Sequence, residues 1–113
     1  MKTDRMKQNY YDEFAKQGYK IIQNRTSLMT ASNNEKTLGI FTTSNMAKWL
    51  DRNVYKQNLN QSLSPTGDKK AALDQPGLKD MTLKAIDILE ARSGKDGWFL
   101  MYVNTTNNAQ DIY

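Results

Sequence analysis

The sequence contains no histidine and no cysteine among its 113 residues. Without histidine it lacks the commonest general base of enzymes and the imidazole ligands of most catalytic zinc sites, and no Ser-His relay can form within it. Without cysteine it has neither disulfides nor thiolate chemistry. Any chemistry in this chain therefore depends on carboxylates, hydroxyls, amides and cations.

Long apolar runs are also missing. No stretch approaches the roughly 18–20 apolar residues that a membrane span needs, and Met1 leads into polar sequence rather than into the apolar part of a secretory signal. The sequence thus predicts no membrane span and, by default, a cytoplasmic location. Hydrophobic residues make up 38% of the chain, below the usual share of about 45–50%, which predicts a thin core.

Charge is present but scattered. The net charge of +4 comes from 16 Lys and Arg against 12 Asp and Glu, and the longest basic run, Lys69-Lys70, is flanked by Asp68 and Asp74. A nucleic-acid-binding surface gathers its cations on one face or in one run, so no nucleic-acid partner is predicted. The carboxylates are equally dispersed, and no spacing among them resembles a cation-binding loop. We interpret them as solvated surface and helix ends.

The strongest structural signal runs from Pro76 to Val103. Its first half has the three-and-four recurrence of an amphipathic helix, with Asp80 in the first turn and Gly94 at the stop. The predicted buried stripe is Leu78, Met81, Ala85, Ile86, Ile88 and Leu89, and the residues predicted to face water are Lys79, Lys84, Asp87 and Glu90. Residues 97–103 then carry no charge and no alternation, which predicts a parallel strand buried on both faces.

The preceding chain alternates between the same two kinds of element. We predict a helix over residues 4–17, a short helix or turn within 24–32, and strands over 19–23 and 37–41. This order predicts the α/β class, with a partial parallel sheet of about three strands and flanking helices. Residues 42–75 are predicted to be a long irregular loop with one helical turn at 46–50. A connection of this length is either a functional loop or a disordered insert.

Candidate binding motifs are weak. The segments 67–69 and 94–97 are the nearest approach to phosphate-binding loops, but neither has the P-loop pattern or its strand-to-helix context. Asp51 and Arg52 follow Trp49, which we expect to be buried. Anchoring of the loop is favoured over a functional ion pair at this position.

Three blocks of sequence resemble a known family. The blocks GYKIIQNRTSLM, KTLGIFTTSNMAKWLDRN and PGLKDMTLKAIDILEARSGKDGWFLM resemble, in order and spacing, the late part of the catalytic domain of alkaline phosphatases, over about residues 6–101. The resemblance implies a piece of a larger α/β fold. It also implies a parent enzyme, usually a homodimer, that hydrolyses phosphate monoesters through a serine nucleophile, two zinc ions and one magnesium ion.

The resemblance also shows what this chain lacks. The family's nucleophilic serine and phosphate-binding arginine lie upstream of the matched blocks, and Val103 stands where the family has a metal-ligand glutamate. No Ile-Asp-x-x-x-His pattern follows. We therefore predict no catalytic, metal-binding or cofactor-binding residue in this chain, and interpret residues 1–103 as a partial catalytic domain and 104–113 as an unrelated polar tail.

The break in similarity after Met101 favours a truncated alkaline phosphatase-like protein that is inactive by itself. The alternative is a non-catalytic interaction module that docks on a full-length relative or another partner. Its unpaired strand edges would provide the docking surface.

Overall fold

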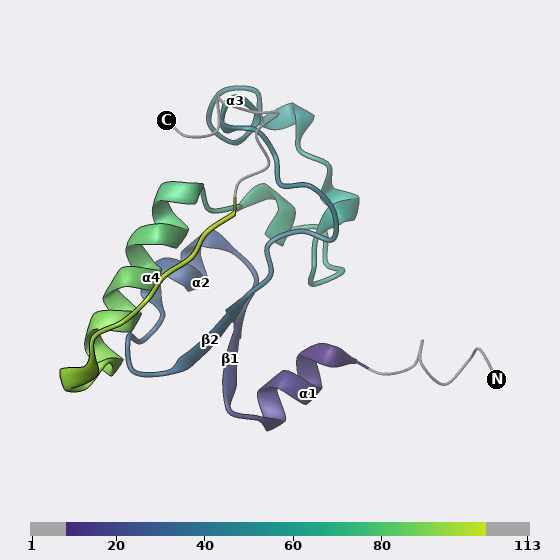
Figure 1. Cartoon of the computed structure of the whole chain (residues 1–113). Coiled ribbons are helices and arrows are strands. Elements are labelled where there is room, and N and C mark those ends of the chain that lie inside the picture. Colours follow the sequence, from purple (N-terminus) through teal and green to yellow (C-terminus); the bar gives the residue numbers. More distant parts are fainter. Residues whose placement is uncertain (1–8, 104–113) are drawn as a thin grey trace.

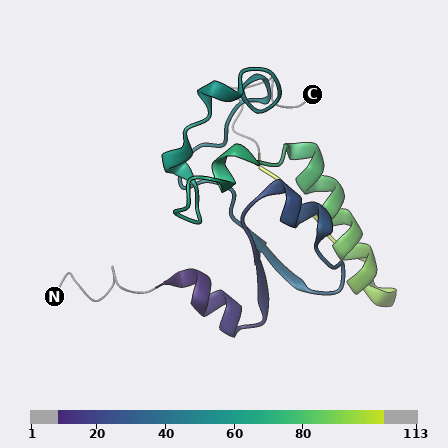
Figure 2. The same cartoon turned by 180° about the vertical axis from the view of Figure 1, so that it is seen from behind.

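The computed structural model describes residues 9–103, which form four α-helices and a two-stranded parallel sheet joined by irregular segments. The strands cross the middle of the molecule, and the longest helix, α4 (Leu78–Arg92), lies along one side of them (Figure 1). Seen from behind, the short helix α2 (Arg25–Thr30) lies beside α4 (Figure 2). The alternation of helices with parallel strands confirms the predicted α/β class.

The first helix, α1 (Tyr10–Lys16), begins and ends at signals that the sequence supplies. The Asn9 side chain accepts a hydrogen bond from the Tyr11 amide at 3.1 Å, which satisfies one of the free donors at the helix start. Gly18, with a φ of +85°, turns the chain out of the helix. The prediction over residues 4–17 is confirmed where it can be compared, and its first five positions lie outside the described residues.

Two strands make up the sheet, β1 (Tyr19–Ile22) and β2 (Lys36–Gly39). They pair in parallel with Tyr19 opposite Lys36 and Ile22 opposite Gly39. The helix α2 (Arg25–Thr30) lies in the crossover between them, and the Asn24 side chain caps it by accepting from the Ser27 amide at 2.7 Å. Both predicted strands and the predicted short helix are confirmed.

The predicted third strand is wrong. The prediction placed it over residues 97–103, but these residues form no strand and run alongside α4 (Figure 1). Phe99 and Val103 are 82% and 83% exposed. A strand buried on both faces needs a covering layer on each side, and the described residues provide none over this segment. The sheet therefore has two strands rather than about three.

The helix α4 (Leu78–Arg92) confirms the predicted helix, but one of its side chains was placed wrongly. Lys84, predicted to face water, is only 9% exposed, and its ammonium group donates a hydrogen bond to the carbonyl oxygen of Ala31. Position 84 lies three residues after Met81 and four before Ile88, so it falls on the half-buried stripe itself. Its aliphatic stem packs there while its end reaches a backbone acceptor beyond α2.

The central core lies between the C-terminal ends of the strands and the two neighbouring helices. Ile22, Leu28 and Phe41 are its buried members, and Met81 packs against them from α4. The Phe41 ring lies over Gly39, where an added Cβ would come within 2.7 Å of the ring. Glycine is therefore needed at the end of β2 for the ring to reach the core.

Residues 42–75 are irregular, as predicted, but they are folded. They contain α3 (Trp49–Asn53) and 3₁₀ turns at Lys56–Asn58, Gln61–Leu63 and Ala71–Leu73. Ala71 and Ala72 are buried, and the Ser64 hydroxyl accepts from the Ala72 amide at 2.7 Å. Packing and side-chain hydrogen bonds replace regular secondary structure in this part of the chain.

Candidate functional site

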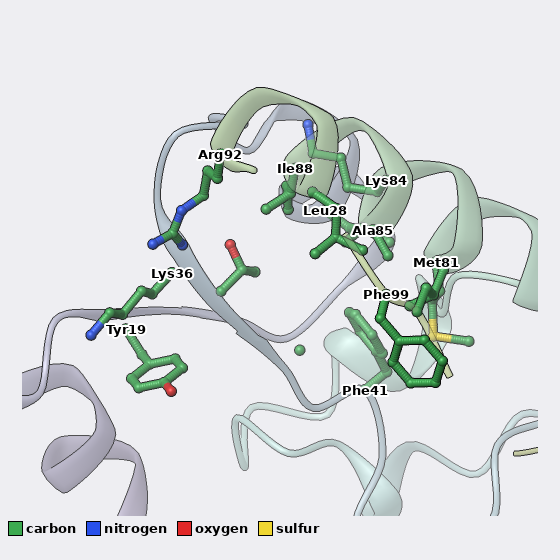
Figure 3. Close-up of a pocket in the computed structure, with 14 residues that line it drawn as sticks. Tyr19, Leu28, Lys36, Phe41, Met81, Lys84, Ala85, Ile88, Arg92 and Phe99 are labelled. Carbon is green, nitrogen blue, oxygen red and sulfur yellow. The ribbon is translucent and has the colours of Figure 1, made fainter. Parts of the chain in front are cut away.

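A hollow of about 510 Å³ lies between the sheet and α4, and we call it the apolar groove. Figure 3 shows Phe41, Phe99 and Met81 at one end, and Tyr19, Lys36 and Arg92 at the other. The remaining lining residues are Leu28, Thr37, Gly39, Lys84, Ala85, Ile88, Leu89 and Leu100. The groove thus combines an apolar interior with a basic end, and none of its lining residues is acidic.

A second hollow, of about 470 Å³, lies at the start of α4 and is lined mainly by polar side chains. Arg25 and Asp80 form an ion pair across it, with 2.8 Å between Nε and Oδ2 and 3.3 Å between Nη2 and Oδ1. The Asp74 carboxylate accepts from the amide of Thr26 at 3.0 Å and from its hydroxyl at 2.7 Å. Asp74 thus joins α2 to the segment before α4, and Asp80 joins α2 to the first turn of α4, which is a structural role.

The hydrogen bond from Arg25 lowers the pKa of Asp80 below its ordinary value of 3.8, and the Gly77 amide, donating at 3.1 Å, adds to this effect. A carboxyl whose pKa is depressed by folding stabilises the fold above its unfolded pKa, and this contribution is lost as the pH falls through the folded pKa. The Asp80 side chain is 23% exposed and that of Arg25 is 48% exposed, so solvent screens the pair.

Replacing Asp80 by asparagine is therefore expected to lower the free energy of unfolding by less than about 1 kcal/mol near neutral pH. The difference from the wild type should disappear as acid protonates Asp80. Urea unfolding followed from about pH 6 down to about pH 2 checks this. Asp87→Asn, on the exposed face of the same helix, is the control, and an unchanged pH profile in Asp80→Asn would contradict the assignment.

The zinc and magnesium ions implied by the resemblance do not fit the described residues. No group of three or more Asp, Glu, His or Cys side chains converges in the part of the chain covered by the structure. Val103, which the resemblance predicts to stand at the position of a metal-ligand glutamate, has an apolar side chain that is 83% exposed. Hard cations need several converging oxygen ligands, so we derive no step through a metal in this segment.

The other sequence candidates have structural roles. Asp51 accepts from Asn58 at 2.9 Å, and Arg52 Nη1 donates to the carbonyl oxygen of Ala47 at 2.9 Å, so both anchor the loop. Trp49, expected to be buried, is 39% exposed because it lies at the start of the short surface helix α3. In segment 67–69, the Asp68 carboxylate accepts from the Lys70 amide at 2.9 Å and closes a turn. No strand precedes this turn directly, and only the three-residue 3₁₀ turn Ala71–Leu73 follows it.

Sequence reasoning missed the basic end of the apolar groove. Lys36 lies on β2 and Arg92 in the last turn of α4, so more than fifty positions of sequence separate the two cations. No local motif connects them. Only the packing of α4 beside the sheet brings them to one end of the groove.

The fold is of the α/β class with two parallel strands, and no group of three or more metal-ligating side chains converges among residues 9–103. A family model described as Alkaline phosphatase matches residues 2–106. The chain therefore belongs to the alkaline phosphatase family, as the three sequence blocks predicted. No curated protein and no solved structure matches the chain. No helix within residues 9–103 is long and apolar enough to cross a membrane.

Proposed function

We propose that this chain derives from a hydrolase of phosphate monoesters and contributes scaffold rather than catalytic groups. The observation that carries the proposal is the family match over residues 2–106, in a sequence that has no histidine. The family mechanism needs a serine nucleophile and a cluster of metal ligands. The described residues offer packed helices and strands, and Asp74 and Asp80 among their carboxylates accept hydrogen bonds that hold α2 against its neighbours.

The contacts of two carboxylates, Asp74 and Asp80, support a scaffolding role for this chain. Asp80 is held by Arg25 and by the start of α4, and Asp74 is held by Thr26. These contacts give the two carboxylates structural roles, and no group of three or more ligand-type side chains converges within residues 9–103. The segment therefore supports the position of other parts of a phosphatase fold and does not itself stabilise the charge of a transferring phosphoryl group.

The purified 113-residue chain is expected to hydrolyse p-nitrophenyl phosphate no faster than a mock purification, with zinc and magnesium supplied at alkaline pH. An active alkaline phosphatase in the same buffers verifies the assay. A zinc-indicator competition on the same sample provides a second readout, and we expect no stoichiometric zinc binding. Hydrolysis that co-elutes with the chain and is abolished by a chelator would overturn the proposal.

A second candidate function is a non-catalytic module that docks on a full-length relative. The exposed run of residues 98–103 favours it, because Phe99, Met101 and Tyr102 are 82%, 73% and 65% exposed. An uncovered, uncharged segment of this kind can add to the edge of another sheet. Retention of a purified full-length alkaline phosphatase on the immobilised chain would support docking, and loss of retention in Phe99→Lys would assign it to this segment.

A further inference from the structure

The apolar groove is a part of the core that the described residues leave unfilled. Met81, Ala85 and Ile88 face it from α4, and Leu28 faces it from α2 (Figure 3). The helix α4 packs chiefly on α2 rather than on the strands, so a space of about 510 Å³ remains against β2. That volume lies within the range of about 300–1,000 Å³ that is typical of small-molecule sites.

The basic end of the groove has charge that no carboxylate of residues 9–103 pairs with. The Lys36 ammonium lies 5.6 Å from the centre of the Tyr19 ring, and Arg92 approaches the same end from α4 (Figure 3). The ion pairs Lys16–Glu13 and Arg25–Asp80 involve neither of these two cations. Lys84, the third basic lining residue, is already bonded to Ala31.

We propose that the apolar groove binds a single amphiphile with one anionic headgroup and an aliphatic tail. The tail lies on the apolar surface formed by Leu28, Ile88 and Leu89, where burial removes hydrocarbon from water. The headgroup lies between Lys36 and Arg92, whose cations complement its charge. The inference rests on the groove alone and is independent of the proposed phosphatase ancestry.

Titration of the full chain with decanoate by isothermal calorimetry, below the micelle concentration, tests the proposal. We expect saturable binding of one decanoate per chain. Decanol, which has the tail without the charge, and decyltrimethylammonium, which has the opposite charge, are each expected to bind at least about tenfold more weakly. Equal binding of all three compounds, or no saturable binding of decanoate, would overturn the proposal.

Two double variants test whether Lys36 and Arg92 bind the headgroup. The double substitution Lys36→Gln with Arg92→Gln is expected to weaken decanoate binding about tenfold, because two screened charge contacts are lost. Lys69→Gln with Lys70→Gln removes the same charge from an exposed turn and should leave binding unchanged. Equal loss in both double variants would show that net charge, rather than this site, governs binding.

Filling the groove gives an independent check. Ala85→Trp places a large side chain in it from α4 and is expected to weaken decanoate binding at least about tenfold. Leu83→Trp, at a position on the same helix that is 52% exposed, is the matched control. Circular dichroism verifies that both variants are folded, and undiminished binding by folded Ala85→Trp would overturn the assignment.

Two further measurements exclude other occupants. Light scattering on the ligand-free chain reports whether a second copy fills the groove, and a stable dimer that does not bind decanoate would overturn the proposal. Sedimentation with phosphatidylserine vesicles reports binding to a membrane surface. Vesicle binding without binding of free decanoate would assign the basic end to a lipid surface and overturn the single-amphiphile site.

Discussion

Replacing Ile22 by alanine is expected to lower the free energy of unfolding by about 2–5 kcal/mol. Ile22 is 1% exposed and packs with Leu28 and Phe41, so it joins β1 to α2 and to the end of β2. The substitution removes buried hydrocarbon and leaves a cavity that these neighbours fill only in part. A domain is stable by only about 5–15 kcal/mol, so this single change removes a large share of the total.

Urea unfolding followed by circular dichroism checks the expectation, which corresponds to a midpoint lower by roughly 1 M or more. The stability of Ile22→Val should lie between those of the wild type and Ile22→Ala, with a loss of about 0.5–1.5 kcal/mol in the free energy of unfolding. Val54→Ala, at a position that is 54% exposed, is the control and should change the free energy of unfolding by no more than about 0.5 kcal/mol. Equal effects at the two positions would show that Ile22 is not part of the core.

The predictions that succeeded rest on local signals. The apolar recurrence and the acidic first turn identify α4, and glycine after a polar helix identifies the start of β1. The error at Lys84 has a physical cause, because a long aliphatic side chain can lie on a buried stripe when its end finds an acceptor. The acceptor is the carbonyl oxygen of Ala31, which is distant in sequence. The spacing of apolar and polar residues along α4 therefore could not predict this hydrogen bond.

The error at residues 98–103 is of another kind. The run has the composition of a buried strand, but a strand exists only where a neighbouring edge and covering layers are present. In this structure the groove separates the run from β2, and Phe99 and Leu100 line that groove instead of pairing. The basic end of the groove could not be predicted from the sequence for a related reason, because only tertiary packing brings Lys36 and Arg92 close together.

The long irregular segment gives the second large expected effect, at Gln75. This side chain is 8% exposed and joins two distant parts of the segment. Its Oε1 accepts from the Ala47 amide at 3.0 Å, and its Nε2 donates to the carbonyl oxygen of Ala72 at 3.0 Å. Neither contact has a sequence signal, because a lone glutamine in a polar segment is usually solvated.

Gln75→Leu keeps the approximate volume of the side chain but leaves the Ala47 amide and the Ala72 carbonyl without these partners. An unsatisfied buried group costs about 1–3 kcal/mol, so two such groups would cost about 2–6 kcal/mol. The expected loss is the lower part of this range, about 2–4 kcal/mol, because the Ala47 contact is only partly buried. The same change at exposed Gln57 should stay within about 0.5 kcal/mol.

Hydrogen exchange separates this cause from a general loss of packing. In the wild type the Ala47 amide should be protected by its bond to Gln75, and in Gln75→Leu it should exchange faster, relative to amides of β1, than global destabilisation alone explains. An equal increase in the exchange rates of the Ala47 amide and the β1 amides would mean that the substitution destabilises the whole fold. Gln75 would then have no specific role in holding Ala47. Selective acceleration at Ala47 would show that two side-chain hydrogen bonds of Gln75 hold distant parts of the long segment together, in place of the regular secondary structure that it lacks.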